Sequence, residues 1–206
     1  GNGETFFCAA KVLSDPLEIV PGDVLEKWLM LVSGHVAKAV VVKPVLTRPV
    51  CENTVGAALR EPGVAIRSFH LGNVKARLEM QKQALGLADA TFARAMQRFR
   101  QLAGVKMGEK AFRDFAVELF GGEAANDSTQ AKKRLALVCD LYEHGRGQEI
   151  DGSKGTAWGA FNTVSEYTTH WARTSQPRTK YALLGAGDDL VQKAQKLLAR
   201  QYAVAA

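Results

Sequence analysis

The feature that most constrains the fold is a change of hydrophobic periodicity near residue 72. Before this point, apolar and β-branched residues come in short runs separated by turn signals, a pattern typical of antiparallel strands. After it, apolar residues recur at three- and four-residue spacings between glycines that end helices. A chain with strands first and helices afterwards favours an α+β fold, in which the helices are segregated from an antiparallel sheet.

The first part predicts an antiparallel β-meander of three or four strands. Four runs share a β-rich apolar composition with turn residues between them: 5–13, 17–20, 25–32 and 37–46. Residues 50–60 change to a helical spacing and predict a helix packed on the sheet, and residues 64–70 predict one more strand. Residues 1–72 therefore form the expected β-meander plus helix core.

The second part, residues 73–206, is the expected helical region. Six segments have helical spacing with a cap or a stop signal: 74–85, 89–102, 108–120, 128–144, 156–173 and 188–205. Gly86 is expected to end the first of them. Residues 174–183 contain Pro177 and are expected to form a loop.

Composition excludes several classes of protein. Hydrophobic residues make up 47% of the 206 residues, enough for a substantial core. No apolar run approaches the roughly 20 residues of a membrane span, and the first ten residues lack the pattern of a signal peptide. The three cysteines lack C-x-x-C spacing and are expected to be reduced thiols. We therefore expect a cytoplasmic protein.

The net charge of +6 is unevenly distributed. Seven Lys/Arg balance seven Asp/Glu in residues 1–70, so residues 71–206 carry the whole excess. A basic region favours an anionic partner, with nucleic acid as the first candidate, and the alternative is a basic protein with no such partner.

A glycine-rich loop, residues 145–156, runs directly into the helix predicted at 156–173. Free backbone N–H groups at a helix N-terminus attract phosphate, and Arg146 and Lys154 add positive charge. The loop is not a nucleotide-triphosphate loop, since Lys154 is followed by Gly155 and not by Ser or Thr. Two interpretations remain: a contact with a nucleic-acid phosphate, or a turn in which Thr156 caps the helix.

The helix that follows has two distinct lines of residues. An apolar stripe comprises Ala157, Phe161, Val164, Thr168 and Trp171. A polar line comprises Asn162, Glu166 and His170. The polar line is interpreted as a metal-ligand set, as a polar interface or as a solvated face. The sequence contains no G-x-S-x-G pattern, which would indicate a serine nucleophile.

Other cations and aromatics are candidates for nucleic-acid contacts. Lys132, Lys133 and Arg134 lie in the first turns of a helix, where cations oppose the helix dipole unless an anion binds. Arg94 and Arg98 form a second basic strip. Five aromatic residues are available for stacking on bases: Trp28, Phe69, Trp158, Tyr167 and Trp171. Of these, Trp158 is expected in the core.

Three blocks of sequence together resemble a known family. The first block, residues 50–60, contains VCENT and AALR. The second block, residues 66–87, contains IR, HLGNV, ARL and ALGL. The third block, residues 145–170, contains GRG, GTAWGAFN, EY and His170. This combination resembles a domain-of-unknown-function family of phages and plasmids, the phage/plasmid-like proteins. The resemblance implies work on mobile DNA, and a meander followed by a helix is similar to phage single-strand annealing proteins. Residues 33–38 depart from the family pattern.

From these features we predict an oligomeric, non-enzymatic DNA-binding protein that binds or anneals single strands in recombination. The residues expected to contact phosphates are Arg48, Arg60, Arg67, Lys75, Arg77, Arg146, Lys154 and Arg173. The prediction includes no catalytic residue, metal or other cofactor. Two alternatives are a phage factor that binds a host defence complex, and a metal-dependent enzyme centred on Glu166 and His170.

Overall fold

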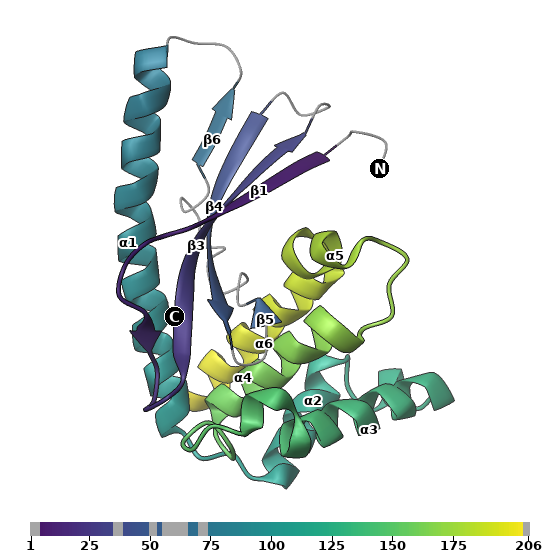
Figure 1. Cartoon of the computed structure of the whole chain (residues 1–206). Helices are drawn as coiled ribbons and strands as arrows, with labels where there is room; N and C mark the ends of the chain where they lie inside the picture. The colour runs from purple at the N-terminus through teal and green to yellow at the C-terminus, as the bar shows by residue number, and fades with distance from the viewer. Residues whose placement is uncertain (1–4, 35–38, 50–52, 55–65, 70–73, 204–206) are drawn as a thin grey trace.

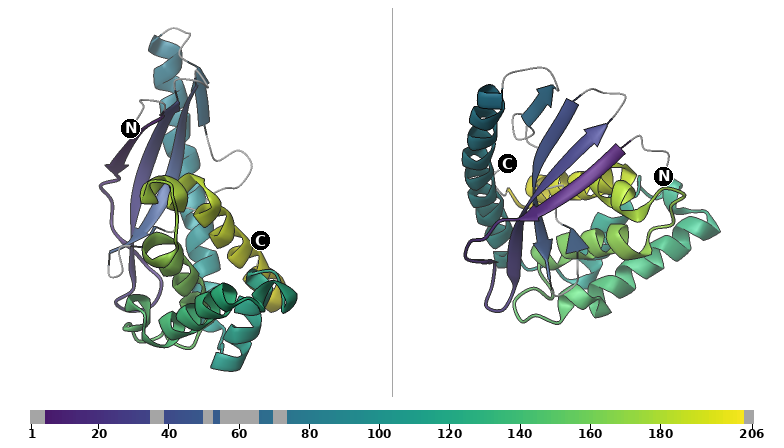
Figure 2. Two further views of the ribbon diagram at one scale, coloured as in Figure 1. Left: turned by 90° about the vertical axis from the view of Figure 1, so that its right-hand side faces the viewer. Right: turned by 45° about the horizontal axis from the view of Figure 1, so that its top comes forward.

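The computed structural model describes residues 5–34, 39–49, 53–54, 66–69 and 74–203, and it has an α+β fold (Figure 1). A twisted antiparallel sheet comes from the first part of the chain, with the long helix α1 (Val74–Gly104) beside it. The other helices gather around the end of the sheet where β5 (Asn53–Thr54) lies, as the two further views also show (Figure 2). The predicted fold class is confirmed.

A long hairpin of β3 (Val24–Gly34) and β4 (Ala39–Arg48) forms the centre of the sheet, with Glu26 opposite Thr47. The remaining strands all pair antiparallel with this hairpin: β1 (Thr5–Lys11) and β2 (Leu17–Glu18) with β3, and β5 and β6 (Ile66–Phe69) with β4. The predicted helix over 50–60 is wrong at residues 53–54. These two residues extend the sheet because they pair with Thr47 and Arg48, and the rest of that segment lies outside the described residues.

Helices follow the sheet. The longer ones are α1, α2 (Glu109–Leu119), α3 (Thr129–His144), α4 (Ala157–Glu166), α5 (Arg178–Leu184) and α6 (Ala186–Tyr202). Short 3₁₀ turns are η2 (Ala124–Asn126) and η3 (Arg146–Gln148), and η4 (Tyr167–Trp171) is a π-helix that continues α4.

Two predicted boundaries are wrong for identifiable reasons. The helix α1 does not end at Gly86, because the next turns bury Ala88, Phe92 and Phe99, and this burial outweighs the roughly 1 kcal/mol that an internal glycine costs. Residues 178–184 form α5 and not a loop. Pro177 precedes this helix, where its fixed φ of −51° and missing N–H are tolerated.

The hydrophobic core is a cluster shared by the sheet and the helices. Leu25 and Leu46 from the hairpin belong to the same buried cluster as Phe99 of α1 and Trp158 and Phe161 of α4. The Phe99 ring centroid lies 4.6 Å from that of Trp158 and 5.5 Å from that of Phe161. Trp158 is therefore a core residue, as predicted.

Candidate functional site

Arg48 and Asp23 form a fully buried ion pair at the end of the sheet. Arg48 ends β4 and Asp23 precedes β3, so the hairpin brings the two side chains together. Arg48 Nε lies 2.5 Å from Asp23 Oδ1 and Nη2 lies 2.6 Å from Oδ2, a bidentate geometry. Both side chains are 0% exposed. The prediction that Arg48 contacts a phosphate is therefore wrong, because its charge is paired and out of reach of solvent.

Groups from α4 and from the loop before it converge on this pair. Ser153 Oγ and the Trp158 indole Nε1 each donate to Asp23 Oδ2 at 2.7 Å. Arg48 Nη1 donates to the carbonyl of Gly147 at 2.9 Å. A buried carboxylate and guanidinium are stable when such partners replace water. The network therefore joins the sheet to the helical region.

The start of α4 is closed to a phosphate. Thr156 Oγ1 accepts the N–H of Gly159 at 3.1 Å, which confirms Thr156 as the N-cap. The N–H of Ala157 donates to the carbonyl of Val105 at 2.9 Å. Since Ala157 and Gly159 have these partners and are buried, their N–H groups do not form the predicted phosphate contact.

Close packing explains the glycines of this loop and helix. A Cβ on Gly147 would lie 2.6 Å from Arg48 Nη1, and a Cβ on Gly159 would lie 2.9 Å from Gln148 Oε1. Real Cβ atoms essentially never come closer than 3.0 Å to such atoms. The glycines therefore let the loop reach the buried network.

The polar line on α4 faces the same loop. The Glu166 carboxylate is 2% exposed and accepts from the N–H groups of Arg146 and Gly147, both at 3.4 Å. Asn162 is buried, and its Cβ lies next to Gly147. His170 is partly exposed. No group of three His, Cys, Asp or Glu side chains arranged to hold a metal occurs among the described residues. Glu166 and Asn162 therefore form an internal polar interface with the loop.

Trp171 departs from the predicted apolar stripe. The other four stripe residues are buried as predicted: Ala157, Phe161, Val164 and Thr168. Trp171, in contrast, is 50% exposed. The π-helix is the reason, since the N–H of Ala172 bonds to the carbonyl of Tyr167, five residues back, at 2.7 Å. Each residue of a π-helix turns through a smaller angle than in an α-helix, so the last residues leave the line of the stripe.

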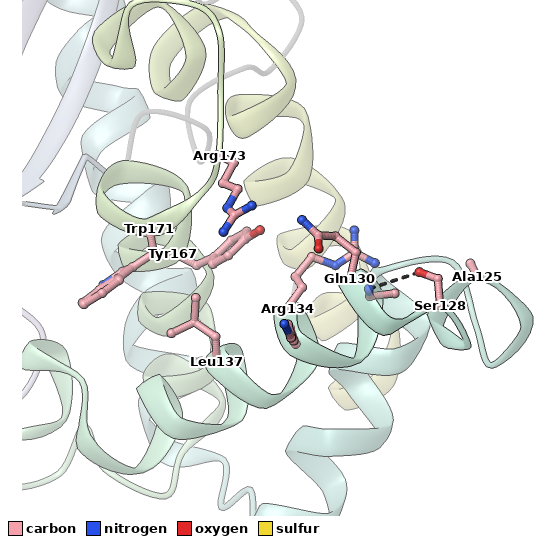
Figure 3. Close-up of a pocket in the computed structure, with 10 residues that line it drawn as sticks. Ala125, Ser128, Gln130, Arg134, Leu137, Tyr167, Trp171 and Arg173 are labelled. Carbon is pink, nitrogen blue, oxygen red and sulfur yellow. Dashed lines mark hydrogen bonds between the residues drawn. The ribbon is translucent and has the colours of Figure 1, made fainter.

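The exposed indole borders a pocket of about 410 Å³ between α3 and the π-helix (Figure 3). Its described lining residues are Ala125, Ser128, Gln130, Ala131, Lys133, Arg134, Leu137, Tyr167, Trp171 and Arg173. Three of them are cationic, two are aromatic and none of those described is acidic. In Figure 3 the Trp171 ring lies at the opposite end of the pocket from Ala125 and Ser128. The arrangement suits an elongated anion with an aromatic group.

The Phe120 ring contacts two of the residues that line the pocket, Arg134 and Tyr167. Arg134 Cζ lies 4.2 Å from the centroid of the Phe120 ring, a cation–π contact. The Phe120 and Tyr167 rings meet edge to face, with centroids 5.9 Å apart. Burial raises the pKa of Tyr167, while the Arg134 charge acts in the opposite direction.

The predicted phosphate contacts do not gather at one place among the described residues. Arg173 lines the pocket, whereas Arg146 and Lys154 are exposed on the loop around η3. For three others the structure gives the backbone alone, in β6 and α1: Arg67, Lys75 and Arg77. Arg60 lies outside the described residues. Arg48 cannot share a phosphate-binding surface with these residues, because it is buried and paired with Asp23.

The sequence contains the parts of the pocket but not their connection. The sequence identifies Lys133 and Arg134 as part of a run of charges on a helix. It identifies Trp171 as an aromatic residue available for stacking. Contact between the two segments depends on how α3 packs against the π-helix, and no local spacing contains that information.

None of the described helices has both the length and the apolar character that a membrane span needs. One curated relative is a glutamyl-tRNA(Gln) amidotransferase subunit from Methanococcoides burtonii, 28% identical over 96 residues, which is 41% of this chain and 20% of that protein. The chain thus spans a fifth of the length of this relative, and the match assigns no site residue. No solved structure matches the chain.

The family comparison covers far more of the molecule. Residues 1–198 match the family described as "Domain of unknown function (DUF932)". This range contains the buried Asp23–Arg48 network, the glycine-rich loop and the pocket. The chain belongs to the DUF932 family.

Proposed function

We propose that this protein binds single-stranded nucleic acid along the basic pocket between α3 and the π-helix, and that single-stranded DNA is its preferred ligand. The observation that carries the proposal is the charge of the pocket: Lys133, Arg134 and Arg173 line it, and none of its described lining residues is acidic. The proposal places the protein in phage or plasmid DNA recombination in a bacterial cytoplasm, where it assembles into oligomers on the strand.

The position of the cations on α3 supports an anionic ligand. Lys133 and Arg134 follow one another on the 16-residue helix α3 and line the same pocket as Arg173. Like charges in one pocket repel each other, and a bound phosphate offsets this repulsion.

The length of the pocket favours a strand over a small anion. Its α3 lining extends from Ser128 to Leu137, a span of about 14 Å at 1.5 Å per residue. Successive phosphates of one strand rise about 3.4 Å along the axis of a stacked helix, so the pocket extends beside more than one phosphate. A strand can therefore contact the cations of α3 and Arg173 together.

The test is a salt titration of binding to labelled single strands of about 30 nucleotides, with duplex DNA and RNA for comparison. Three phosphate contacts predict a slope of about −2 for log K against log salt, or a loss of about 15-fold between about 50 and 200 mM salt. No binding at the lowest salt, or a flat titration, would contradict the proposal.

Charge-removing variants locate the contacts. Lys133→Gln, Arg134→Gln and Arg173→Gln should each weaken binding about 3- to 10-fold for all sequences alike and make the slope shallower by about 0.7. Lys196→Gln is the matched control, because this exposed lysine lies on α6 and does not line the pocket. If the control weakens binding as much as the pocket variants, the site is elsewhere. Sedimentation with and without the strand measures the proposed assembly.

A further inference from the structure

Trp171 combines exposure with an unusual backbone. Among the described residues, the exposed large apolar side chains are Leu13 and Trp171, and of these two Trp171 lines a pocket with cations. Leaving half of an indole in water is unfavourable, since the ring is among the largest apolar surfaces in a protein. The π-helix holds the indole at this position, and π-helical segments are frequent at functional sites.

We propose that the Trp171 indole is a stacking platform for one unpaired base of the bound strand, while the pocket cations hold its phosphates. This inference rests on the proposed function and adds the recognition of a base to it. The chemistry required is an aromatic face beside positive charge, and aromatic stacking with a basic groove is how proteins hold single strands without reading their sequence.

The geometry separates the two parts of such a ligand. In Figure 3 the Arg173 side chain extends toward Tyr167, and the Trp171 ring points to the other side of Leu137. Trp171 is the last residue of the π-helix and Arg173 lies two residues further along the chain, so a strand with one base on the indole can place a neighbouring phosphate on Arg173. Bases in a duplex are paired and stacked, so they do not reach an indole on the protein surface. The platform therefore produces a preference for single strands.

The experiment compares an oligothymidine strand with an abasic strand of the same length, which has the same phosphates and no bases. The wild-type protein should bind oligothymidine about 5- to 150-fold more tightly, the range expected for one stacked base. Trp171→Ala should lose this difference and bind both strands equally, with an unchanged slope against salt. Trp171→Phe should retain part of it, because a smaller ring still stacks.

Fluorescence gives an independent readout. Oligothymidine should quench the tryptophan emission of the wild-type protein, and Trp171→Phe should remove most of this quenching. Trp28→Phe is the control, since Trp28 lies in β3 and does not line the pocket. A melting curve for each variant checks the fold, which should be preserved because the indole is half exposed.

The outcomes separate the two proposals. If both strands bind the wild-type protein equally, the stacking platform is refuted and the nucleic-acid function stands. If neither strand binds at low salt, both proposals fail. If oligothymidine is preferred equally by wild type and Trp171→Ala, the base is recognised elsewhere and the platform is again refuted.

Discussion

At the residue scale, the environment of single polar groups decides how stability responds to pH. The Tyr142 hydroxyl donates to the carbonyl of Met107 at 2.5 Å, and its ring stacks on Phe112 with centroids 3.9 Å apart. The side chain is buried, and this burial raises the pKa of Tyr142 to about 12. Ionisation of this hydroxyl would place a charge inside the helical region and remove a hydrogen-bond donor.

We predict that the free energy of unfolding falls as pH rises from about 10 to about 12. The unfolded state loses the Tyr142 proton near pH 10, whereas the folded state retains it to about pH 12, so the unfolded state binds fewer protons between these values. The stabilisation is complete below pH 10, and its loss approaches about 2–3 kcal/mol at pH 12. Denaturant titrations at several pH values measure it.

Tyr142→Phe is the control for this pH dependence. The variant lacks the hydroxyl, so its free energy of unfolding should depend less steeply on pH over the same range. A smaller dependence remains, because burial also raises the pKa of Tyr167 and of Tyr181. Identical pH dependence in variant and wild type would show that the Tyr142 hydroxyl is not responsible.

At the scale of elements, tertiary packing keeps α1 continuous through a residue that favours a break. Gly86 is exposed, and a Cβ added there meets nothing within 4 Å. We predict that Gly86→Ala increases the free energy of unfolding by about 0.5–1 kcal/mol, because alanine loses less backbone entropy in a helix. Chemical denaturation measures the change.

Gly121→Ala is the opposite control. Gly121 has φ +104°, and a Cβ there would lie 3.0 Å from the Cβ of Ala125. This substitution should therefore destabilise the protein. A loss of stability in Gly86→Ala would indicate that α1 bends or ends at this residue.

At the scale of the whole molecule, the Asp23–Arg48 pair connects parts that are distant in sequence. The two side chains come from the hairpin, and their other partners are Gly147, Ser153 and Trp158 of the later loop and helix. Because the pair is buried, removing one member leaves a charge with no solvent and no counterion. The network therefore makes the sheet and the helical region dependent on each other.

We predict that Asp23→Ala and Arg48→Met each lower the free energy of unfolding by about 3–5 kcal/mol. The double variant should lose less than the sum, since neither charge is then left alone. Asp127→Asn is the control, because its pair with Lys132 is exposed and is worth at most about 1 kcal/mol. Losses in the single variants no larger than in this control would show that the pair does not hold the molecule together.

The elements with strong local signals could be predicted from sequence alone. β-rich apolar runs with turn residues between them indicated the hairpin, and the Ser128 cap with its helical spacing indicated α3, which the structure gives as Thr129–His144. The Thr156 cap and the burial of Trp158 were likewise foreseeable. Each of these features depends on residues within a few positions of one another, so periodicity and capping contain the necessary information.

The sequence by itself thus determined the α+β class, the main strands and helices, and the excess of positive charge after residue 70. The tertiary structure decided what those charges do. In the sequence Arg48 is one of many basic residues, and only the fold pairs it with Asp23. The spacing of Trp171 predicts a buried position, whereas the π-helix exposes the indole. The physical reason is that desolvation and pairing depend on neighbours in space, which the order of residues along the chain does not specify.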